Sequence, residues 1–222
     1  MHPQKFNNTL YEILRFNELL ARVQFKCDLV VLIGKRNSGF NICMDPPFVQ
    51  NGSKMGEALY ISGSTYDDIL FMKTLNPKRW VGFVPEGFET LDKLDDVDIE
   101  LHYLLELKDS EDFTISEIVN EITNRNFDSA FINLYSPFIS NPENGGVLKA
   151  KQLQIIIEIG SRNKENVIFS WYKLLYRFFF DFNYALIGAQ SDGFCGRKIK
   201  SCKYRLSFVQ SNLAEPPVFG FG

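Results

Sequence analysis

Apolar and polar positions in the first 85 residues follow the periods of helices and strands. Apolar side chains recur every three or four positions over residues 6–25, which predicts an amphipathic helix. A second helix is predicted over 64–75, where Ser64 is a suitable N-terminal cap. Short runs rich in valine, isoleucine and leucine, bounded by turn residues, predict four strands at 28–34, 40–44, 58–62 and 79–84.

The pattern is sharper beyond residue 97. From Asp98 to Lys108 apolar and polar residues alternate, as in a strand with one buried face. Thr114 and Glu117 have the spacing of a capping box ahead of a helix. Two strands, a long helix and another strand follow at 129–135, 152–160, 164–182 and 184–190. This β-α-β-β-α-β order predicts a ferredoxin-like unit, to which 203–209 adds an edge strand.

An acidic stretch at 86–98 separates the two patterns and is the best candidate for a boundary. We therefore expect an α+β protein in two parts. Residues 1–95 form a smaller α+β half, with a helix, a hairpin and a β-α-β passage. Residues 96–222 form the ferredoxin-like unit, its edge strand and an extended tail, and the two parts pack together.

The long helix predicted at 164–182 has two apolar stripes, whereas a surface helix usually has one. The first stripe contains Trp171 and suits a sheet. The second contains Phe169, Tyr172 and Tyr176. It suits either the helix at 6–25 or a partner protein, and internal packing is favoured because large exposed apolar patches are rare on monomers.

The stretch VVLIGKRNSGFNI contains the first half of a phosphate-binding loop, with Gly34 and Gly39 at the required spacing. Such a loop needs lysine and then serine or threonine directly after the second glycine. Here those positions hold Phe40 and Asn41, and Pro46-Pro47 prevents the helix that should follow. The stretch therefore predicts a β-hairpin that turns at Asn-Ser-Gly.

His102 is the only histidine outside the first few residues. The ferredoxin-like strand order would place it beside the strand that carries Gln152, Gln154 and Glu158. His102, Glu106 and Glu158 would then bind a metal or act as an acid–base group. The simpler interpretation is a solvated polar sheet face, which strand alternation alone predicts.

Charge is segregated, although the net charge of the 222 residues is only −3. Residues 86–112 hold eleven acids against two lysines, a balance of −9. An acidic surface suits a basic partner protein and repels nucleic acid. The basic segment 195–205 could contact phosphate groups, but lysines at a hairpin tip explain it equally well.

Four cysteines, at 27, 43, 195 and 202, fit neither a zinc module nor a disulfide scaffold. We expect reduced thiols, no metal and no cofactor. No apolar run is long enough for a signal core or a membrane span. These features predict a soluble cytoplasmic protein that does not insert into membranes.

Three functions compete. The favoured one is a non-enzymatic protein-binding module of the inhibitor or immunity type, which occludes a basic enzyme through its acidic segment and aromatic surface. Its predicted partner-binding residues are Asp92, Asp95, Asp96, Asp98, Phe169, Tyr172 and Tyr176. The second is an enzyme that uses His102, Glu106 and Glu158 on a small acidic substrate. The third is nucleic-acid binding through the sheet face and the 195–205 segment.

Overall fold

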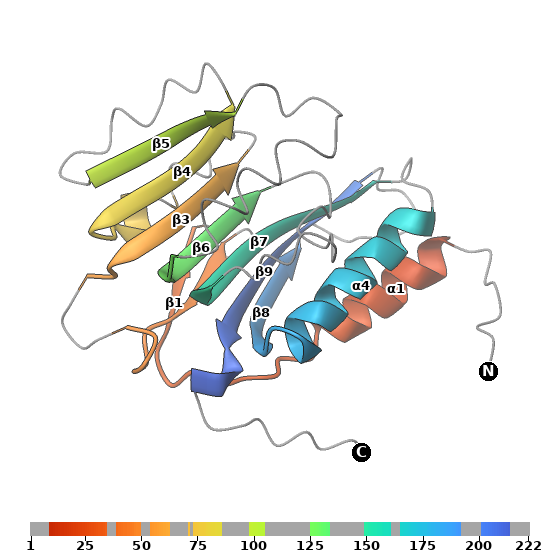
Figure 1. Ribbon diagram of the computed structural model, residues 1–222. Coiled ribbons are helices and arrows are strands. Elements are labelled where there is room, and N and C mark those ends of the chain that lie inside the picture. Colours follow the sequence, from red (N-terminus) through yellow and green to blue (C-terminus); the bar gives the residue numbers. More distant parts are fainter. Residues whose placement is uncertain are drawn as a thin grey trace.

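The structure is a computed structural model, and seven strands of one mixed sheet dominate it (Figure 1). It describes residues 9–34, 39–49, 54–62, 71, 73–85, 98–104, 125–133, 149–160, 165–191 and 201–213.

The large sheet has the strand order β5-β4-β3-β6-β7-β9-β8. Its first five strands in this order are parallel neighbours, whereas β9 is antiparallel to both β7 and β8. Parallel neighbours require a crossover connection rather than a hairpin. The strands are β3 (Glu57–Ser62), β4 (Arg79–Pro85), β5 (Asp98–Leu104), β6 (Phe127–Asn133), β7 (Ala150–Gly160), β8 (Tyr184–Ser191) and β9 (Ser201–Gln210).

The predicted ferredoxin-like α+β fold is wrong, because this sheet is a doubly wound α/β sheet. In a ferredoxin-like unit β7 would lie between β5 and β6 and would pair with β6 as an antiparallel hairpin. Instead β6 and β7 are parallel neighbours, and β5 pairs with β4. The predicted boundary at 95/96 falls between β4 and β5, which are adjacent strands of one sheet. The predicted edge strand, β9, lies between β7 and β8.

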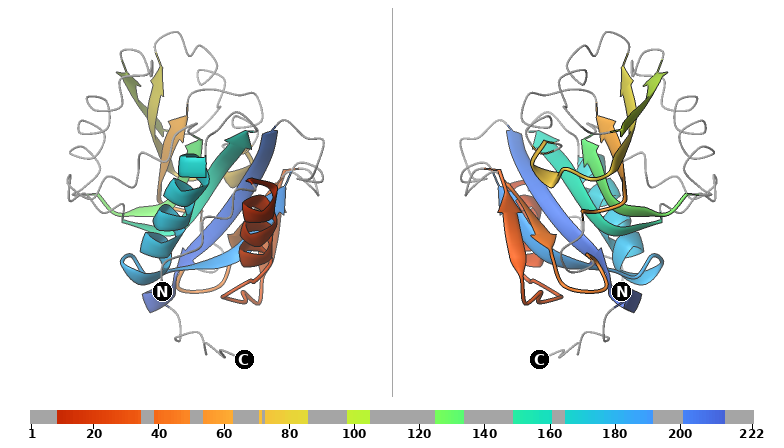
Figure 2. Two further views of the ribbon diagram at one scale, coloured as in Figure 1. Left: turned by 90° about the vertical axis from the view of Figure 1, so that its right-hand side faces the viewer. Right: turned by 90° about the vertical axis from the view of Figure 1, so that its left-hand side faces the viewer.

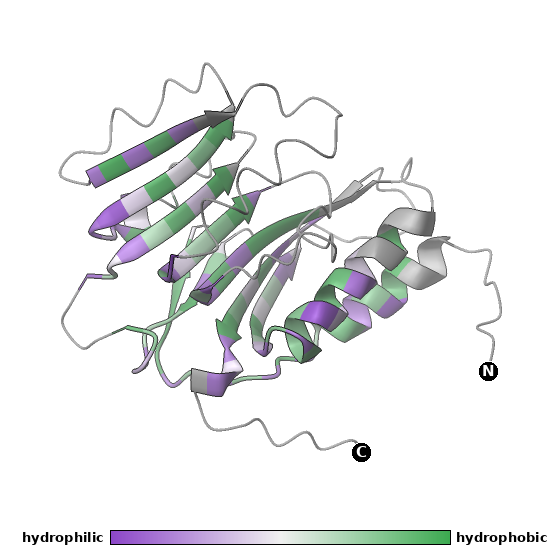
Figure 3. Cartoon of the chain, in the orientation of Figure 1, coloured by the Kyte–Doolittle hydropathy of each residue, from purple (hydrophilic) through white to green (hydrophobic). Residues whose placement is uncertain are grey.

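The hydropathy of the strands agrees with their places at the edge or in the middle of the sheet. Purple and green positions alternate along β5 at the edge of the sheet (Figure 3). The inner strand β6 is buried at six of its seven positions, so it is covered on both faces. Near-continuous apolar runs are typical of parallel strands that have elements packed on each side.

Two helices cover one face of the sheet: α1 (Thr9–Leu20) and α4 (Glu165–Phe180) (Figure 2). Ile168, Trp171 and Leu175 of α4 belong to the core on this face. The Tyr172 ring meets Phe16 of α1 edge to face, with ring centroids 5.3 Å apart. Part of the second apolar stripe is therefore used internally, as the sequence favoured. Neither described helix is long and apolar enough to cross a membrane.

A two-stranded hairpin covers part of the other face: β1 (Val30–Ile33) and β2 (Phe40–Cys43) are antiparallel. The hairpin prediction is confirmed, although the predicted turn residues 37 and 38 lie outside the described residues. Gly34, directly after β1, adopts a φ of 107°, which favours glycine. Apolar residues of β2, β3, β4 and β6 form a second core on this side. A short 3-10 helix, η4 (Ser211–Leu213), follows β9.

Candidate functional site at the carboxyl edge of the sheet

The order of the strands defines a switch point between β3 and β6. After β3 the chain adds β4 and β5 on one side of it, and after β5 it returns to add β6 and β7 on the other. In open α/β sheets ligands bind outside the carboxyl ends of the strands at such a point, because the two adjacent connections leave in opposite directions. The carboxyl ends of β3 and β6 are therefore the candidate site.

Five residues form one cross-strand row at this level of the sheet. Strand pairing places Ser62 opposite Asn133, Asn133 opposite Ile156, Ile156 opposite Arg205, and Arg205 opposite Gln190. We call these residues the edge row. Ser62 and Asn133 are the last residues of β3 and β6, whereas β7 continues four residues beyond the row. β6 therefore ends at the row, whereas β7 and its neighbour β9 extend beyond it.

The polar members of the edge row are buried. Asn133 and Arg205 are each only 5% exposed, and both interact with other groups of the chain. Burial of an amide and a guanidinium at the carboxyl edge is costly unless their hydrogen bonds are satisfied. Sequence reasoning missed Asn133 and included Arg205 only as part of the basic segment 195–205. Asn133 as the last residue of a buried strand was the available signal.

The segments that follow β3 and β4 lie outside the described residues, but their sequences restrict the ligand. Gly63 follows β3 and is the only glycine in the next several residues. The glycine-rich turn that accommodates a diphosphate needs more than one glycine at this place. Glu86 follows β4 directly. In doubly wound nucleotide-binding sheets an acid at this place binds the hydroxyls of a ribose.

The β1–β2 hairpin borders the edge row. Gly39 donates its backbone N–H to Gln190 Oε1 at 3.0 Å, so the start of β2 lies at the level of the row. One step back, Asn41 donates its N–H to Ser207 Oγ at 3.0 Å. Phe40 packs edge to face against Phe131, with centroids 5.5 Å apart. The hairpin therefore forms an apolar cover beside the candidate site.

The predicted trio of His102, Glu106 and Glu158 is not brought together. His102 lies on β5 and Glu158 on β7, four strand spacings away, which is about 19 Å at the usual separation. Glu106 lies outside the described residues, as does the side chain of Glu158. The metal or acid–base site built on these three residues is therefore wrong, because its geometry depended on the ferredoxin-like strand order.

His102 belongs instead to an ion-pair network. Its Nε2 lies 2.8 Å from Glu100 Oε1, and its ring stacks on Phe83. Arg125 donates two hydrogen bonds to Glu100, at 3.0 and 2.9 Å, and Arg79 also pairs with this carboxylate. The hydrogen bonds from Arg125, then that from His102, lower the pKa of Glu100 to about 2.

This network tethers the starts of parallel strands. Arg79 and Glu57 are the first residues of β4 and β3, and Arg125 stands two residues before β6. Arg125 Nη2 also lies 2.9 Å from Glu57 Oε1. The amino ends of parallel strands are opposite the edge where ligands bind, so the network has a structural position.

The predicted partner-binding residues are scattered. Asp92, Asp95 and Asp96 lie outside the described residues, and nothing is described of the Phe169 side chain. Asp98 pairs with Arg79, with 3.3 Å between Oδ2 and Nε. Tyr172 packs on α1, whereas Tyr176 is 60% exposed and its ring contacts Phe180. Binding of a basic partner through these residues stays a prediction.

The basic segment 195–205 also changes meaning. Residues 195–200 lie outside the described residues, but Lys203 and Arg205 are part of β9, inside the sheet. The interpretation as a solvated hairpin tip is therefore wrong for Arg205. Two strands flank this residue, one on each side, and β9 is an interior strand.

Two of the four cysteines form a disulfide, so the expectation of reduced thiols is wrong for them. Cys27 and Cys43 are bonded and buried, with their Cα atoms 5.8 Å apart. Asp45 accepts the N–H groups of Asp28 and Leu29 at 2.7 and 2.8 Å, which fixes the same loop. Asp45 also approaches the Cys43 sulfur at 3.6 Å. A sulfur in a disulfide has no proton to donate and is no thiolate ligand, so this cluster is not a metal site.

Comparison with known proteins gives similarity to solved structures only, since no protein-family model and no curated protein match the chain. The O-methyltransferase from Bacillus cereus in complex with SAH has 13% identity and a TM-score of 0.46, and the match covers 70% of this chain and 74% of that one. The O-methyltransferase TomG from Streptomyces achromogenes, in complex with SAM, has 13% identity and a TM-score of 0.43, over 71% and 74%. TYW2 of M. jannaschii, in complex with AdoMet, has 10% identity and a TM-score of 0.41, over 85% and 90%.

The prediction of a non-enzymatic inhibitor or immunity-type module is wrong. It rested on missing catalytic motifs, segregated charge and an excess of aromatic residues, whereas the strand order has a switch point, the place where open α/β sheets bind ligands.

Proposed function

We propose that the chain binds S-adenosylmethionine at the carboxyl ends of β3, β4 and β6, and that it is a methyltransferase. The observation that carries this proposal is the switch point between β3 and β6 in a doubly wound sheet. When bound, S-adenosylmethionine supplies an electrophilic methyl group for transfer to a nucleophilic acceptor. The strand order favours a ligand at the carboxyl edge of the sheet, and the residues near this edge indicate which kind of ligand fits.

The residues around the switch point fit a nucleoside that carries no phosphate. A dinucleotide needs the glycine-rich turn after the first strand, and a nucleoside triphosphate needs a phosphate-binding loop. Gly63 is the only glycine that closely follows β3, and Gly34 and Gly39 lie next to two antiparallel strands, β1 and β2. S-adenosylmethionine contains an adenosine and an amino-acid group but no phosphate. It therefore has no phosphate for such loops to bind.

Polar groups would hold the two ends of this ligand. Glu86 stands 24 residues after Ser62 (86 − 62), close to the spacing of about 20 residues at which an acid binds the ribose in doubly wound sheets. Its carboxylate would accept hydrogen bonds from the two ribose hydroxyls. The Asn133 amide at the end of β6 both donates and accepts hydrogen bonds. It would orient the polar groups beyond the ribose. Phe40 and Phe131 beside the edge row would limit the access of water.

Isothermal titration calorimetry with S-adenosylhomocysteine, NAD⁺ and ATP tests this proposal. We expect S-adenosylhomocysteine to bind at least ten times more tightly than the two phosphate-containing ligands. Glu86→Gln should weaken binding about ten- to hundredfold, because a hydrogen bond to a charged group contributes about 1.5–3 kcal/mol. Lys173→Gln, an exposed change on α4, is the matched control. Tighter binding of NAD⁺ or ATP, or no binding of S-adenosylhomocysteine by the folded protein, would overturn the proposal.

The Cys27–Cys43 disulfide indicates the kind of cellular compartment in which the protein acts. A cytoplasmic location stays a prediction, and the Cys27–Cys43 disulfide does not support it. Disulfides persist in oxidising compartments and are rare in the reducing cytosol. We infer that the protein acts in an oxidising compartment. Fractionation of cells that express the full chain, with the thiol state trapped by alkylation, distinguishes the two locations.

A further inference from the structure

Arg205 is a charged side chain in the interior of the sheet, on the same row as the candidate site. It lies opposite Ile156 on one side and Gln190 on the other. Asn133 is the next residue along the row beyond Ile156. Arg205 is thus two strand spacings from Asn133, about 10 Å between Cα atoms.

Strand alternation determines the face of the sheet on which Arg205 lies. Ser207 contacts Asn41 of the hairpin, and Tyr204 and Leu206 belong to the core beneath the helices. Residues 205 and 207 therefore share the hairpin face. Asn133 shares this face as well, because Phe131 packs against Phe40 of the hairpin. Arg205 and Asn133 thus belong to the same side of the edge row.

We propose that Arg205 binds the anionic group of the methyl acceptor, so that the acceptor is an acid. This inference rests on the proposed function and adds the chemical class of the second substrate. The guanidinium is always charged, and its planar fork matches a carboxylate or a phosphate. Its 5% exposure matters here, because a charge attracts an anion more strongly in a low-dielectric interior than in water.

The position along the row assigns Arg205 to the acceptor rather than to the nucleoside. Glu86 follows β4 in the sequence, and β4 lies on the β5 side of the switch point, whereas Arg205 lies on the opposite side, beyond β7. A ribose near Glu86 and an acid near Arg205 would place the ligand groups in order across the sheet. Asn133 lies between these two ends of the row, where its amide would orient the groups that face each other.

A purely structural ion pair is the competing interpretation. Arg205 interacts with other groups of the chain, so its charge is partly compensated without any substrate. A guanidinium has five N–H donors, however, and can serve a chain partner and a ligand together. The two interpretations differ in whether the protein distinguishes an acid from its neutral analogue.

The test compares benzoate, phenyl phosphate and benzamide as probes of matched size, by calorimetry with and without S-adenosylhomocysteine. We expect the wild-type protein to bind one of the two anions at least ten times more tightly than benzamide. The tighter anion distinguishes a carboxylic acceptor from a phosphorylated one. Arg205→Gln should abolish the preference, and Arg205→Lys should retain part of it, because lysine keeps the charge but loses the fork.

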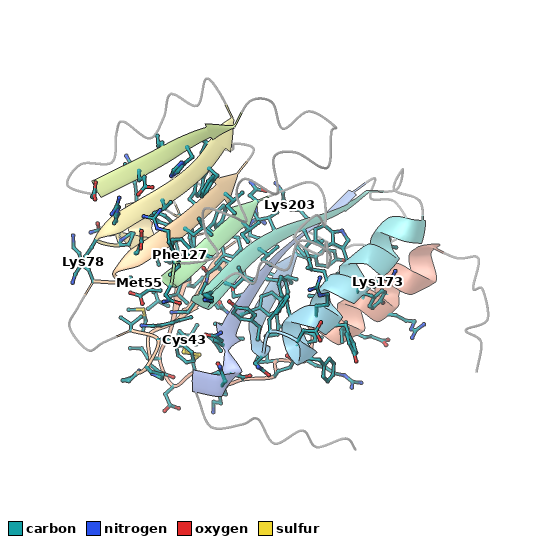
Figure 4. The ribbon with its side chains drawn as sticks, viewed as in Figure 1. Cys43, Met55, Lys78, Phe127, Lys173 and Lys203 are labelled. Atoms are coloured by element: carbon teal, nitrogen blue, oxygen red, sulfur yellow. A yellow bond between two sulfur atoms is a disulfide. The ribbon has the colours of Figure 1, made fainter. Side chains whose placement is uncertain are left out.

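Controls separate this inference from the proposed function. Lys173 lies on α4, which covers the other face (Figure 4), so Lys173→Gln should keep the anion preference. Unchanged preference in a folded Arg205→Gln protein, or no preference in the wild type, would overturn the inference, with or without S-adenosylhomocysteine. Weaker binding of S-adenosylhomocysteine but not of methylthioadenosine would instead assign Arg205 to the carboxylate of the cofactor. If no nucleoside binds but the anion preference persists, the proposed function alone fails.

Discussion

Gln152 should be among the most sensitive polar positions in the protein, because its side chain docks the hairpin onto the sheet. It is fully buried in β7. Its Oε1 accepts the N–H of Cys43, and its Nε2 donates to the carbonyl of Cys43, both at 2.8 Å. Figure 4 shows Cys43 at the hairpin, below the central strands.

The hairpin itself cannot satisfy these two backbone groups. Met44 donates its N–H to the Leu29 carbonyl, so Leu29 and Met44 form a hydrogen-bonded pair. Pairs alternate along an antiparallel ladder, so the next pair, Val30 and Cys43, is not hydrogen-bonded. The N–H and C=O of Cys43 therefore point away from β1. Gln152→Leu would leave both buried groups without a partner, at about 1–3 kcal/mol each.

The expected loss is about 2–6 kcal/mol of the free energy of unfolding. For a chain of this size a loss near 3 kcal/mol lowers the melting temperature by about 6–12 °C. Urea unfolding followed by circular dichroism measures the change. Hydrogen exchange of the β1 and β2 amides shows whether the hairpin detaches first, since local opening exposes them before the core.

A double variant on the same strand face is the matched control. Gln154 accepts a hydrogen bond from Ser129 at 2.7 Å, and its own Nε2 is buried without a hydrogen-bond partner. Replacing both members of a hydrogen-bonded pair by apolar groups is nearly neutral, so Ser129→Ala with Gln154→Leu should change stability by less than about 1 kcal/mol. If Gln152→Leu is no more harmful than this double variant, the argument from unsatisfied Cys43 groups is refuted.

Three further predictions follow from other contacts. Cys27 and Cys43 are 16 residues apart, so reduction of their disulfide should lower the free energy of unfolding by about 3 kcal/mol, from the loop-entropy relation. Urea unfolding with and without reductant measures this loss, and equal unfolding midpoints would contradict the prediction. Arg125 is the main reason that the pKa of Glu100 falls to about 2. The stability that this carboxylate adds is therefore present above about pH 4.5 and lost as pH falls towards 2, so Glu100→Gln should cost about 1–2 kcal/mol at pH 7 after discounting for solvent screening and much less near pH 2. Burial raises the pKa of Tyr204 to about 12, so its share of stability should be lost as pH rises from about 10 to 12; in absorbance titrations at alkaline pH, Tyr204→Phe should lack a late-titrating phenol, and an unchanged titration curve would contradict this.

The sequence identified most elements but not their neighbours. The helical period placed α1 and α4 within a few residues of their observed ends, and alternation located β5. Strand order was the failure, because alternation states which residues share a face and says nothing of the adjacent strand. The connection from β6 to β7, residues 134–149, offered the missing signal. It is long enough for a parallel crossover, whereas a hairpin needs only a few residues.

The same error moved the candidate site. With β5 beside β7, His102 and Glu158 formed a plausible pair, and the carboxyl ends of the strands had no special role. With the observed order the informative residues are Asn133 and Arg205, whose positions matter only when β6, β7 and β9 are neighbours. Asn133 belongs to no sequence motif, and Arg205 was considered only as part of the basic segment 195–205, so local spacing could not have placed the two residues on one row.

Several polar residues on the hairpin face of the sheet are buried, although alternating polar residues usually face solvent. Gln152 and Gln154 alternate with apolar residues, which predicts a solvated face, yet both are completely buried. A helix satisfies its own backbone and needs only apolar contacts from a sheet, as on the α1 and α4 side. A short hairpin leaves every second backbone pair unsatisfied, so the strands beneath it must supply hydrogen bonds. The side chains of Gln152, Ser207 and Gln190 accept these hydrogen bonds from the hairpin. Arg205 lies on the same face and also carries a charge, which the hairpin backbone does not require.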